Sequence, residues 1–199
     1  MKVLCVATVR SHIGQFHVNF LNELKKRSAE VHAAYKNNSA DKQGLDLSVI
    51  DEVFEILFQR SPFKADNIKA YFKLKKVIDS GHSDLVHCHT LMGGIITRLV
   101  ARNTRKKELR LCTLRKDFIF LMAPEKNWLL YYMIEKFSSR FSDAIITINN
   151  EDYERAKKFK CKNVFLFHGG GVDINIFHIH TDEKIKQLRE EYNLNGNIS

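Results

Sequence analysis

Short apolar runs alternate with longer amphipathic stretches along most of the chain. The short runs are rich in β-branched residues and contain few polar positions, a pattern typical of strands that are buried on both faces of a parallel sheet. We predict seven such strands, at residues 2–9, 30–35, 53–58, 84–89, 109–114, 143–148 and 163–167.

The amphipathic stretches between these runs predict helices. In the stretch that begins at Lys64, apolar residues recur at helical spacing, while most of the lysines lie off that stripe. Ser11 is expected to cap a helix that follows the first strand. Further helices are predicted at 93–107, with a basic last turn, and at 127–141, 150–159 and 181–194.

Alternating strands and helices predict an α/β, Rossmann-like, doubly wound fold, with a mainly parallel sheet and helices on both faces. A chain of 199 residues can bury one sizeable core but is short for two full domains. We assign residues 1–180 to this domain and residues 181–199 to a linker helix that leads towards a second domain. The chain is therefore expected to be the first half of a larger protein.

The formal net charge of +9 favours anionic partners, such as nucleic acid, phosphorylated ligands or anionic lipid headgroups, although a solvated lysine-rich surface has the same composition. RNA-binding sheets interleave aromatic and basic residues, whereas these strands are apolar and the basic residues lie on predicted helices, so we expect no nucleic acid. Four scattered cysteines fit reduced thiols in a cytoplasmic protein. No apolar run approaches the ~18–20 residues of a membrane span.

In open parallel sheets, ligands bind at the loops that follow the carboxyl ends of the strands. The first such loop contains His12, Gly14, Phe16 and His17. Gly14 would let an anionic ligand approach the free N–H groups of the next helix, and His12 is a candidate for a catalytic or binding role. His17, one turn into the predicted helix, is a second candidate. The loop has no G-x-G-x-x-G fingerprint of a dinucleotide site.

A second loop follows the sequence His87-Cys88-His89. A strand directs His87 and His89 to one side and Cys88 to the other. A metal ion would need a third ligand, and no metal-binding motif supplies one, so we predict no metal. The two histidines have either a purely structural role or a role in binding. We predict that His87 is buried and that the residues in contact with a ligand are His89, Thr90, Gly93 and Gly94.

Two further loops are candidates. Arg115 and Lys116 suit phosphate recognition, and an exposed loop that faces a membrane or a partner is the alternative. The last loop serves either as a hinge or for close approach of the backbone to a ligand, and it comprises Gly169, Gly170, Gly171 and Asp173. It is not a P-loop, because no G-K-[ST] follows.

Several stretches together carry a family resemblance. They span nearly the whole chain and read VATVRSHIGQFHVNFLNELKK, FQRSPFKADNIKAYFKLKKVID, DLVHCHTLMGGIITRLVARNTRKK, KNWLLYYMIEKFSSRFSDAIITINNEDYERAKKF and GGGVDINIF. In these stretches the chain resembles the amino-terminal, acceptor-binding half of a family 4 retaining glycosyltransferase of the GT-B fold. The resemblance points to the EpsD-like subgroup of bacterial capsule and exopolysaccharide biosynthesis.

This resemblance implies transfer of a sugar from a nucleotide-sugar to a lipid-linked saccharide. GT-B enzymes have two Rossmann-like domains that face each other across a cleft, and the carboxy-terminal domain carries most of the nucleotide-sugar site. The resemblance implies no cofactor and no metal, because helix dipoles and basic side chains stabilise the leaving diphosphate. It also implies a cytoplasmic protein, peripheral on the inner face of the plasma membrane, where an anionic surface suits the charge of +9.

The chain departs from the family pattern in its third loop. Relatives read close to Thr-Ala-His-Gly-Phe-His-Phe there, and Arg115 and Phe118 stand at the two histidine positions. His168 stands where a proline is usual. We therefore expect no sugar transfer by the chain alone, and a need for a carboxy-terminal donor domain or a partner chain that supplies one. The alternatives are a non-catalytic, truncated or degenerate binding module of the same fold, and a flavodoxin-like binder of a small ligand.

Overall fold

The computed structural model of the chain describes residues 1–38, 45–104, 110–115, 125–167 and 181–191. The strands form one seven-stranded sheet in the order β3-β2-β1-β4-β5-β6-β7, and all neighbouring strands are parallel. All seven predicted strands are present, which confirms the doubly wound parallel sheet. They are β1 (Lys2–Val9), β2 (Glu30–Lys36), β3 (Glu52–Glu55), β4 (Leu85–Cys88), β5 (Arg110–Arg115), β6 (Ala144–Thr147) and β7 (Asn163–Leu166).

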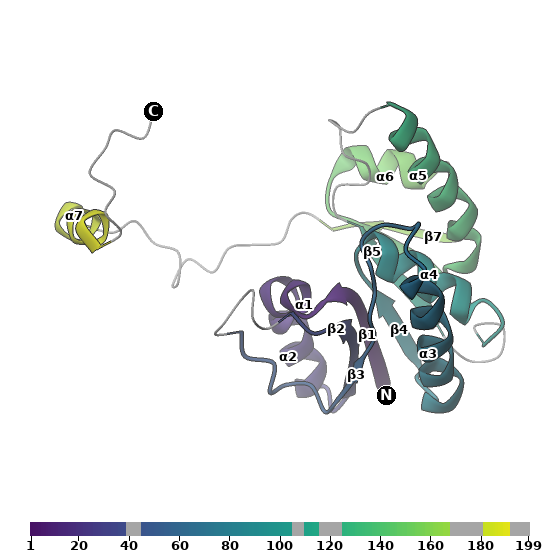
Figure 1. Cartoon of the computed structure of the whole chain (residues 1–199), viewed down its shortest axis with the longest axis horizontal. Helices are drawn as coiled ribbons and strands as arrows, with labels where there is room; N and C mark the ends of the chain where they lie inside the picture. The colour runs from purple at the N-terminus through teal and green to yellow at the C-terminus, as the bar shows by residue number, and fades with distance from the viewer. Residues whose placement is uncertain (39–44, 105–109, 116–124, 168–180, 192–199) are drawn as a thin grey trace. The chain divides into compact units, whose positions relative to one another are not determined.

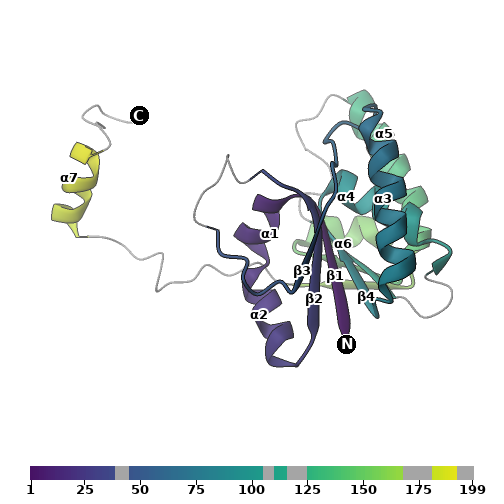
Figure 2. The same ribbon diagram turned by 60° about the horizontal axis from the view of Figure 1, so that its bottom comes forward.

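Helices cover both faces of the sheet, as predicted. Figures 1 and 2 show α1 and α2 on one face and α3, α4 and α5 on the other. The helices are α1 (Arg10–Phe16), α2 (Val18–Lys26), α3 (Asp66–Gly81), α4 (Leu91–Ala101), α5 (Glu125–Ser138), the 3-10 helix η2 (Ser139–Phe141), α6 (Asn150–Ala156) and α7 (Asp182–Glu191).

Two predictions about helix ends were wrong. α4 begins at Leu91 and ends at Ala101, so the basic run that follows does not form its last turn. Ser11 does not cap the first helix, because that helix begins one residue earlier, with Val9 at the N-cap position. The hydroxyl of Ser11 instead accepts a hydrogen bond of 2.9 Å from Nδ2 of Asn38. Ser11 therefore ties α1 to the segment after β2.

Alternate residues of β1 enter two different cores. Val3 and Cys5 pack on the face covered by α1 and α2, while Leu4 and Val6 pack on the face covered by α3 and α4. All four side chains are buried. Because helices cover both faces of the central strands, those strands need apolar residues at successive positions, which is why the sequence shows apolar runs without alternation.

The strand order changes direction between β1 and β4. β2 and β3 extend the sheet on one side of β1, and β4 to β7 extend it on the other. β1 and β4 pair directly, with Val6 opposite Cys88 near their carboxyl ends. In doubly wound sheets, ligands bind at such a switch point. The fold therefore directs attention to the segments that follow β1 and β4.

The chain divides into two compact units, Met1–Gly169 and Gly170–Ser199. The sheet and all helices from α1 to α6 belong to the first unit, and α7 belongs to the second. None of the residues of α7 is buried. The predicted boundary between residues 180 and 181 falls at the end of a segment, 168–180, that lies outside the described residues. Among the residues that are described, no helix is long and apolar enough to cross a membrane.

Candidate functional site

His89 directly follows β4, at the switch point of the sheet. Its ring lies 4.2 Å from the ring of His87, centroid to centroid, in an edge-on arrangement. Cys88, between them in sequence, packs in the core on the opposite face. The prediction that Cys88 lies on the side opposite His87 and His89 is thus confirmed, as is the burial of His87. The two imidazoles lie on the face of the sheet that α1 and α2 cover.

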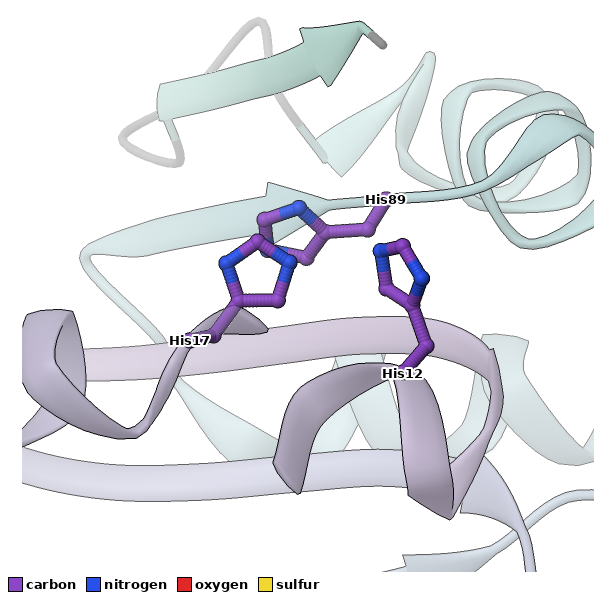
Figure 3. A group of neighbouring side chains, drawn as sticks. All are labelled: His12, His17 and His89. Carbon is purple, nitrogen blue, oxygen red and sulfur yellow. The ribbon is translucent and has the colours of Figure 1, made fainter. Parts of the chain in front are cut away.

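α1, which directly follows β1, and the junction between α1 and α2 bring two further histidines to His89 (Figure 3). The ring centroid of His17 lies 3.7 Å from that of His89, and the ring centroid of His12 lies 5.9 Å from it. His12 and His17 are 5.1 Å apart by the same measure. One ring nitrogen from each of His12, His17 and His89 lies within 4.8 Å of the other two. We call these three residues the histidine cluster.

The histidine cluster corrects one premise of the sequence analysis, which found no third ligand for a metal. His17 does not lie within a helix as predicted, because α1 ends at Phe16 and α2 begins at Val18. It occupies the junction, where its backbone N–H donates to the carbonyl of Ile13 and its own carbonyl accepts from Leu21. Nothing in the local sequence marks that junction, so the approach of His17 to His89 could not be foreseen.

Burial makes two of these imidazoles unusual. His89 is 1% exposed and His17 is 5% exposed. Neither ring nitrogen of His89, and not Nε2 of His17, has a hydrogen-bond partner among the described residues. A buried polar atom left without a partner costs about 1–3 kcal/mol. These unpartnered nitrogens therefore lower the stability of the fold, which argues against a purely structural role for the cluster.

The same burial keeps both rings neutral at ordinary pH. Desolvation, aided by the neighbouring histidines His12 and His87, lowers the pKa of His17 to about 3. Desolvation and the same two neighbours, together with His17, hold the pKa of His89 well below its usual value. A neutral imidazole keeps a lone pair on one nitrogen, so the cluster presents ligating or proton-accepting atoms instead of positive charge.

Thr90 links the loop after β4 to the end of β1. Its backbone has φ 64° and ψ 163°, a region that is nearly confined to glycine and costs about 1–3 kcal/mol. Two contacts hold it there. The backbone N–H of Thr8 donates to Oγ1 of Thr90 at 3.0 Å, and the two threonine hydroxyls hydrogen-bond at 2.6 Å. Strain of this kind is frequent at ligand sites.

The glycines predicted to face a ligand have packing roles. A Cβ on Gly93 would lie 3.1 Å from the backbone nitrogen of Thr8 and 2.9 Å from Oγ1 of Thr90, so α4 can approach β1 only at a glycine. Gly94 is buried in the same turn. A Cβ on Gly14 would lie 2.9 Å from the side chain of Leu45. Contact of any of these glycines with a ligand stays a prediction.

The remaining candidates lie in different places. Phe16 is 57% exposed, and its ring centroid lies 5.2 Å from that of His12, so it borders the cluster on its open side. Arg115 is the last residue of β5, where it pairs with Thr147 at the carboxyl edge of the sheet. Five candidates lie outside the described residues: Lys116, Gly169, Gly170, Gly171 and Asp173.

A buried ion pair holds α4 against α5, and the sequence analysis missed it. Nη1 and Nη2 of Arg98 each donate to a different carboxylate oxygen of Glu135 at 2.8 Å, and Nε donates to the carbonyl of Gly94 at 2.9 Å. Both ion-pair side chains are 1% exposed. Although burial opposes the charged form, Glu135 raises the pKa of Arg98 above its usual value. Through the carbonyl of Gly94, Arg98 thus links the first turn of α4, which directly follows Thr90, to α5.

Comparison with known proteins identifies the family. Residues 2–149 match the family described as Glycosyl transferase 4-like. The chain belongs to this family. Another protein, named "Putative glycosyltransferase EpsD", from Bacillus subtilis (strain 168), is 39% identical to this glycosyl transferase 4-like chain over 194 residues. The alignment covers 96% of the chain and 49% of that protein, so the chain spans about half the length of the curated relative that it matches. The resemblance recognised in the sequence is confirmed.

Solved structures share the fold at low sequence identity. The Alr3699/HepE protein of Anabaena, solved in complex with UDP and glucose, matches this glycosyl transferase 4-like chain with a TM-score of 0.67 and 17% identity, over 99% of the chain and 51% of that protein. The UDP-GlcNAc 2-epimerase of Neisseria meningitidis, solved bound to UDP-GlcNAc, matches with a TM-score of 0.66 and 13% identity, over 98% and 54%. These likenesses confirm the Rossmann-like half of a GT-B fold.

Proposed function

We propose that this glycosyl transferase 4-like domain binds the acceptor in a retaining transfer of a sugar from a nucleotide-sugar to a lipid-linked saccharide, in capsule or exopolysaccharide synthesis. The observation that carries the proposal is the convergence of His12, His89 and Thr90 at the switch point of the sheet, in a chain of this family. Ligands of doubly wound folds bind at that point.

Known structures of the same fold support a nucleotide-sugar as the donor. One was solved with UDP and glucose, and another with UDP-GlcNAc. Each aligns with this chain over about half of its own length. We infer that the donor is held mainly by a second Rossmann-like domain, and that the histidine cluster and Thr90 face the acceptor across the cleft.

The surface of α3 supports a membrane-bound acceptor. Ile68 and Phe72 are 63% and 65% exposed and lie one turn apart, next to the exposed side chains of Lys69, Lys73 and Lys76. Exposed apolar residues flanked by lysines are typical of helices that lie on anionic membrane surfaces. We propose that this face of α3, named here the α3 face, holds the domain at the inner leaflet, where a lipid-linked acceptor would be met.

An assay of sugar transfer tests the proposed reaction. The chain is combined, by mixing or by fusion, with the carboxy-terminal half of the Bacillus subtilis relative and given radiolabelled nucleotide-sugars and a lipid-linked saccharide. We expect labelled lipid only when both halves are present. If the intact relative labels lipid under the same conditions and the combination does not, the proposed function is wrong for this chain. Such a result favours the non-catalytic binding module, which the Arg115 substitution in the third loop also suits.

Vesicle binding tests the membrane part separately. We expect the chain to sediment with vesicles that contain phosphatidylglycerol, and to be released as salt is raised to about 0.5 M. Replacing Lys69, Lys73 and Lys76 with glutamine should abolish binding. The matched control replaces three exposed lysines elsewhere, Lys158, Lys160 and Lys162, and changes the net charge equally. Equal loss in both variants would show a general charge effect and refute a specific role for the α3 face.

A further inference from the structure

The histidine cluster has the composition of a transition-metal site. We propose that His12, His17 and His89 together bind one divalent ion of the zinc class. The expectation of no metal rested on the lack of a third ligand near His87 and His89, and the fold supplies two further imidazoles from α1 and the junction after it. The proposal concerns this chain alone and holds whether or not the sugar-transfer reaction is as proposed.

The distances suit a site that closes around an ion. The three ligating nitrogens lie within 4.8 Å of one another. In a tetrahedral site with Zn–N bonds of 2.0–2.1 Å, such nitrogens lie about 3.3 Å apart. Each nitrogen therefore has to move by less than about 1.5 Å, which rotation of the imidazoles about their side-chain bonds supplies without a change in the backbone. Figure 3 shows the three side chains converging from the end of β4, from α1 and from the junction after α1.

The hydrogen bonding of these rings also suits metal binding, because a metal ion binds imidazole through a free lone pair on a ring nitrogen. The buried ring nitrogens of His89 and Nε2 of His17 have no protein partner among the described residues, so an ion would displace no hydrogen bond there. Three imidazoles without a carboxylate favour zinc, cobalt, nickel or copper over magnesium or calcium.

Three imidazoles leave one position of a tetrahedral ion open. His12 is only partly buried and forms the exposed side of the cluster, with the exposed ring of Phe16 beside it. The open position would therefore face solvent or a bound ligand, as in sites with three protein ligands and one water. Since His89 follows β4 and the other two histidines follow β1, the ion would also tie together the two central strands of the sheet at the switch point.

Titration with Co²⁺ tests this proposal directly. The untagged chain, freed of metal with EDTA and dialysed, is titrated with Co²⁺ at pH 7.5 and followed by visible absorption. We expect tetrahedral bands at about 500–650 nm that saturate at one ion per chain, displacement by Zn²⁺, and no displacement by Mg²⁺. Calorimetry with Zn²⁺ should give the same stoichiometry, and Zn²⁺ should raise the melting temperature of the chain.

Variants locate the ion. His89→Ala and His12→Ala should each weaken Co²⁺ binding at least tenfold and change the absorption bands. Because His12 is partly exposed, we expect His12→Ala to keep the fold. If circular dichroism shows that His89→Ala is unfolded, His12→Ala decides the outcome. The matched control is His82→Asn, on an exposed histidine with φ 45°, a conformation that asparagine tolerates.

Two more controls exclude other sites. His32→Gln removes the imidazole that contacts Glu30 and Glu52. The double variant His178→Gln/His180→Gln removes two further histidines that lie close together in the sequence. Binding should be unchanged in all the controls. No tetrahedral absorption, a stoichiometry other than one, or equal affinity in His12→Ala and the unaltered chain would overturn the proposal, as would loss of binding in any control.

Discussion

The buried pair of Arg98 and Glu135 allows a sharp test of how α4 is held. Arg98→Met removes the two hydrogen bonds of 2.8 Å to the carboxylate and the bond of 2.9 Å to the carbonyl of Gly94. It leaves the charge of Glu135 in a site where the side chain is 1% exposed. Breaking a buried pair in this way costs about 3–5 kcal/mol. Against a total stability of about 5–15 kcal/mol, that is about a fifth or more of the stability of a typical domain.

The double variant Arg98→Met/Glu135→Leu separates pairing from packing. Replacing both charges with apolar side chains of similar size removes the uncompensated charge, so we expect most of the loss to be recovered. The measurement is urea unfolding by far-UV circular dichroism at pH 7.5, with Lys26→Met as the control for an exposed pair with Glu23, which should change stability by less than about 1 kcal/mol. A loss below about 1 kcal/mol in Arg98→Met, or a double variant no more stable than Arg98→Met, would refute this reasoning.

Three further predictions concern the cores and the cluster. Because the folded state holds the pKa of His17 at about 3, against 6.5 for an ordinary histidine, its contribution to stability is complete above pH 6.5 and is lost as the pH falls. Between pH 7.5 and 5.0 this loss amounts to about 2 kcal/mol, and urea midpoints of the EDTA-treated chain should fall accordingly, with a shallower fall in His17→Leu. The thiol of Cys5, whose pKa burial raises to about 12, and the buried thiol of Cys88 should resist iodoacetamide at pH 8 in the native state, as peptide mapping would show; rapid labelling without unfolding would contradict the structure. Gly93→Ala should destabilise the chain by about 1–3 kcal/mol through its clash with β1, whereas Gly81→Ala, whose added Cβ meets nothing closer than 3.8 Å, should be tolerated in the same urea assay.

The sequence predicted the strands well because the physical requirement is local. A strand covered on both faces needs apolar residues at successive positions, and every such run in the sequence became a strand. Helix ends were predicted less well. The actual start of α4 at Leu91 depends on the strained turn at Thr90, and that turn depends on contacts with Thr8, 82 residues away. No local pattern contains that information.

The candidate site was predicted only in part, because some of its features follow from local geometry and others from tertiary contacts. The side on which His87 and His89 lie follows from strand geometry alone. The approach of His17 to His89 requires the junction between α1 and α2, and the pairing of β1 with β4, both of which are tertiary features. The pair of Arg98 and Glu135 was missed because its members are 37 residues apart and each resembles an ordinary charged residue on a helix.

The pairing of β1 with β4 also determines when the site can exist during synthesis. Val6 and Cys88 face each other across the two strands, and the residues between them must be made before this pair can form. Long loops close slowly, and parallel pairs of high sequence separation form late in folding. Until β4 is in place, the apolar side of β1 that later meets α3 and α4 lacks its cover. The segment that contains His12 and His17 therefore emerges from the ribosome long before His89, so an assembled histidine cluster marks a chain in which β1 has already paired with β4.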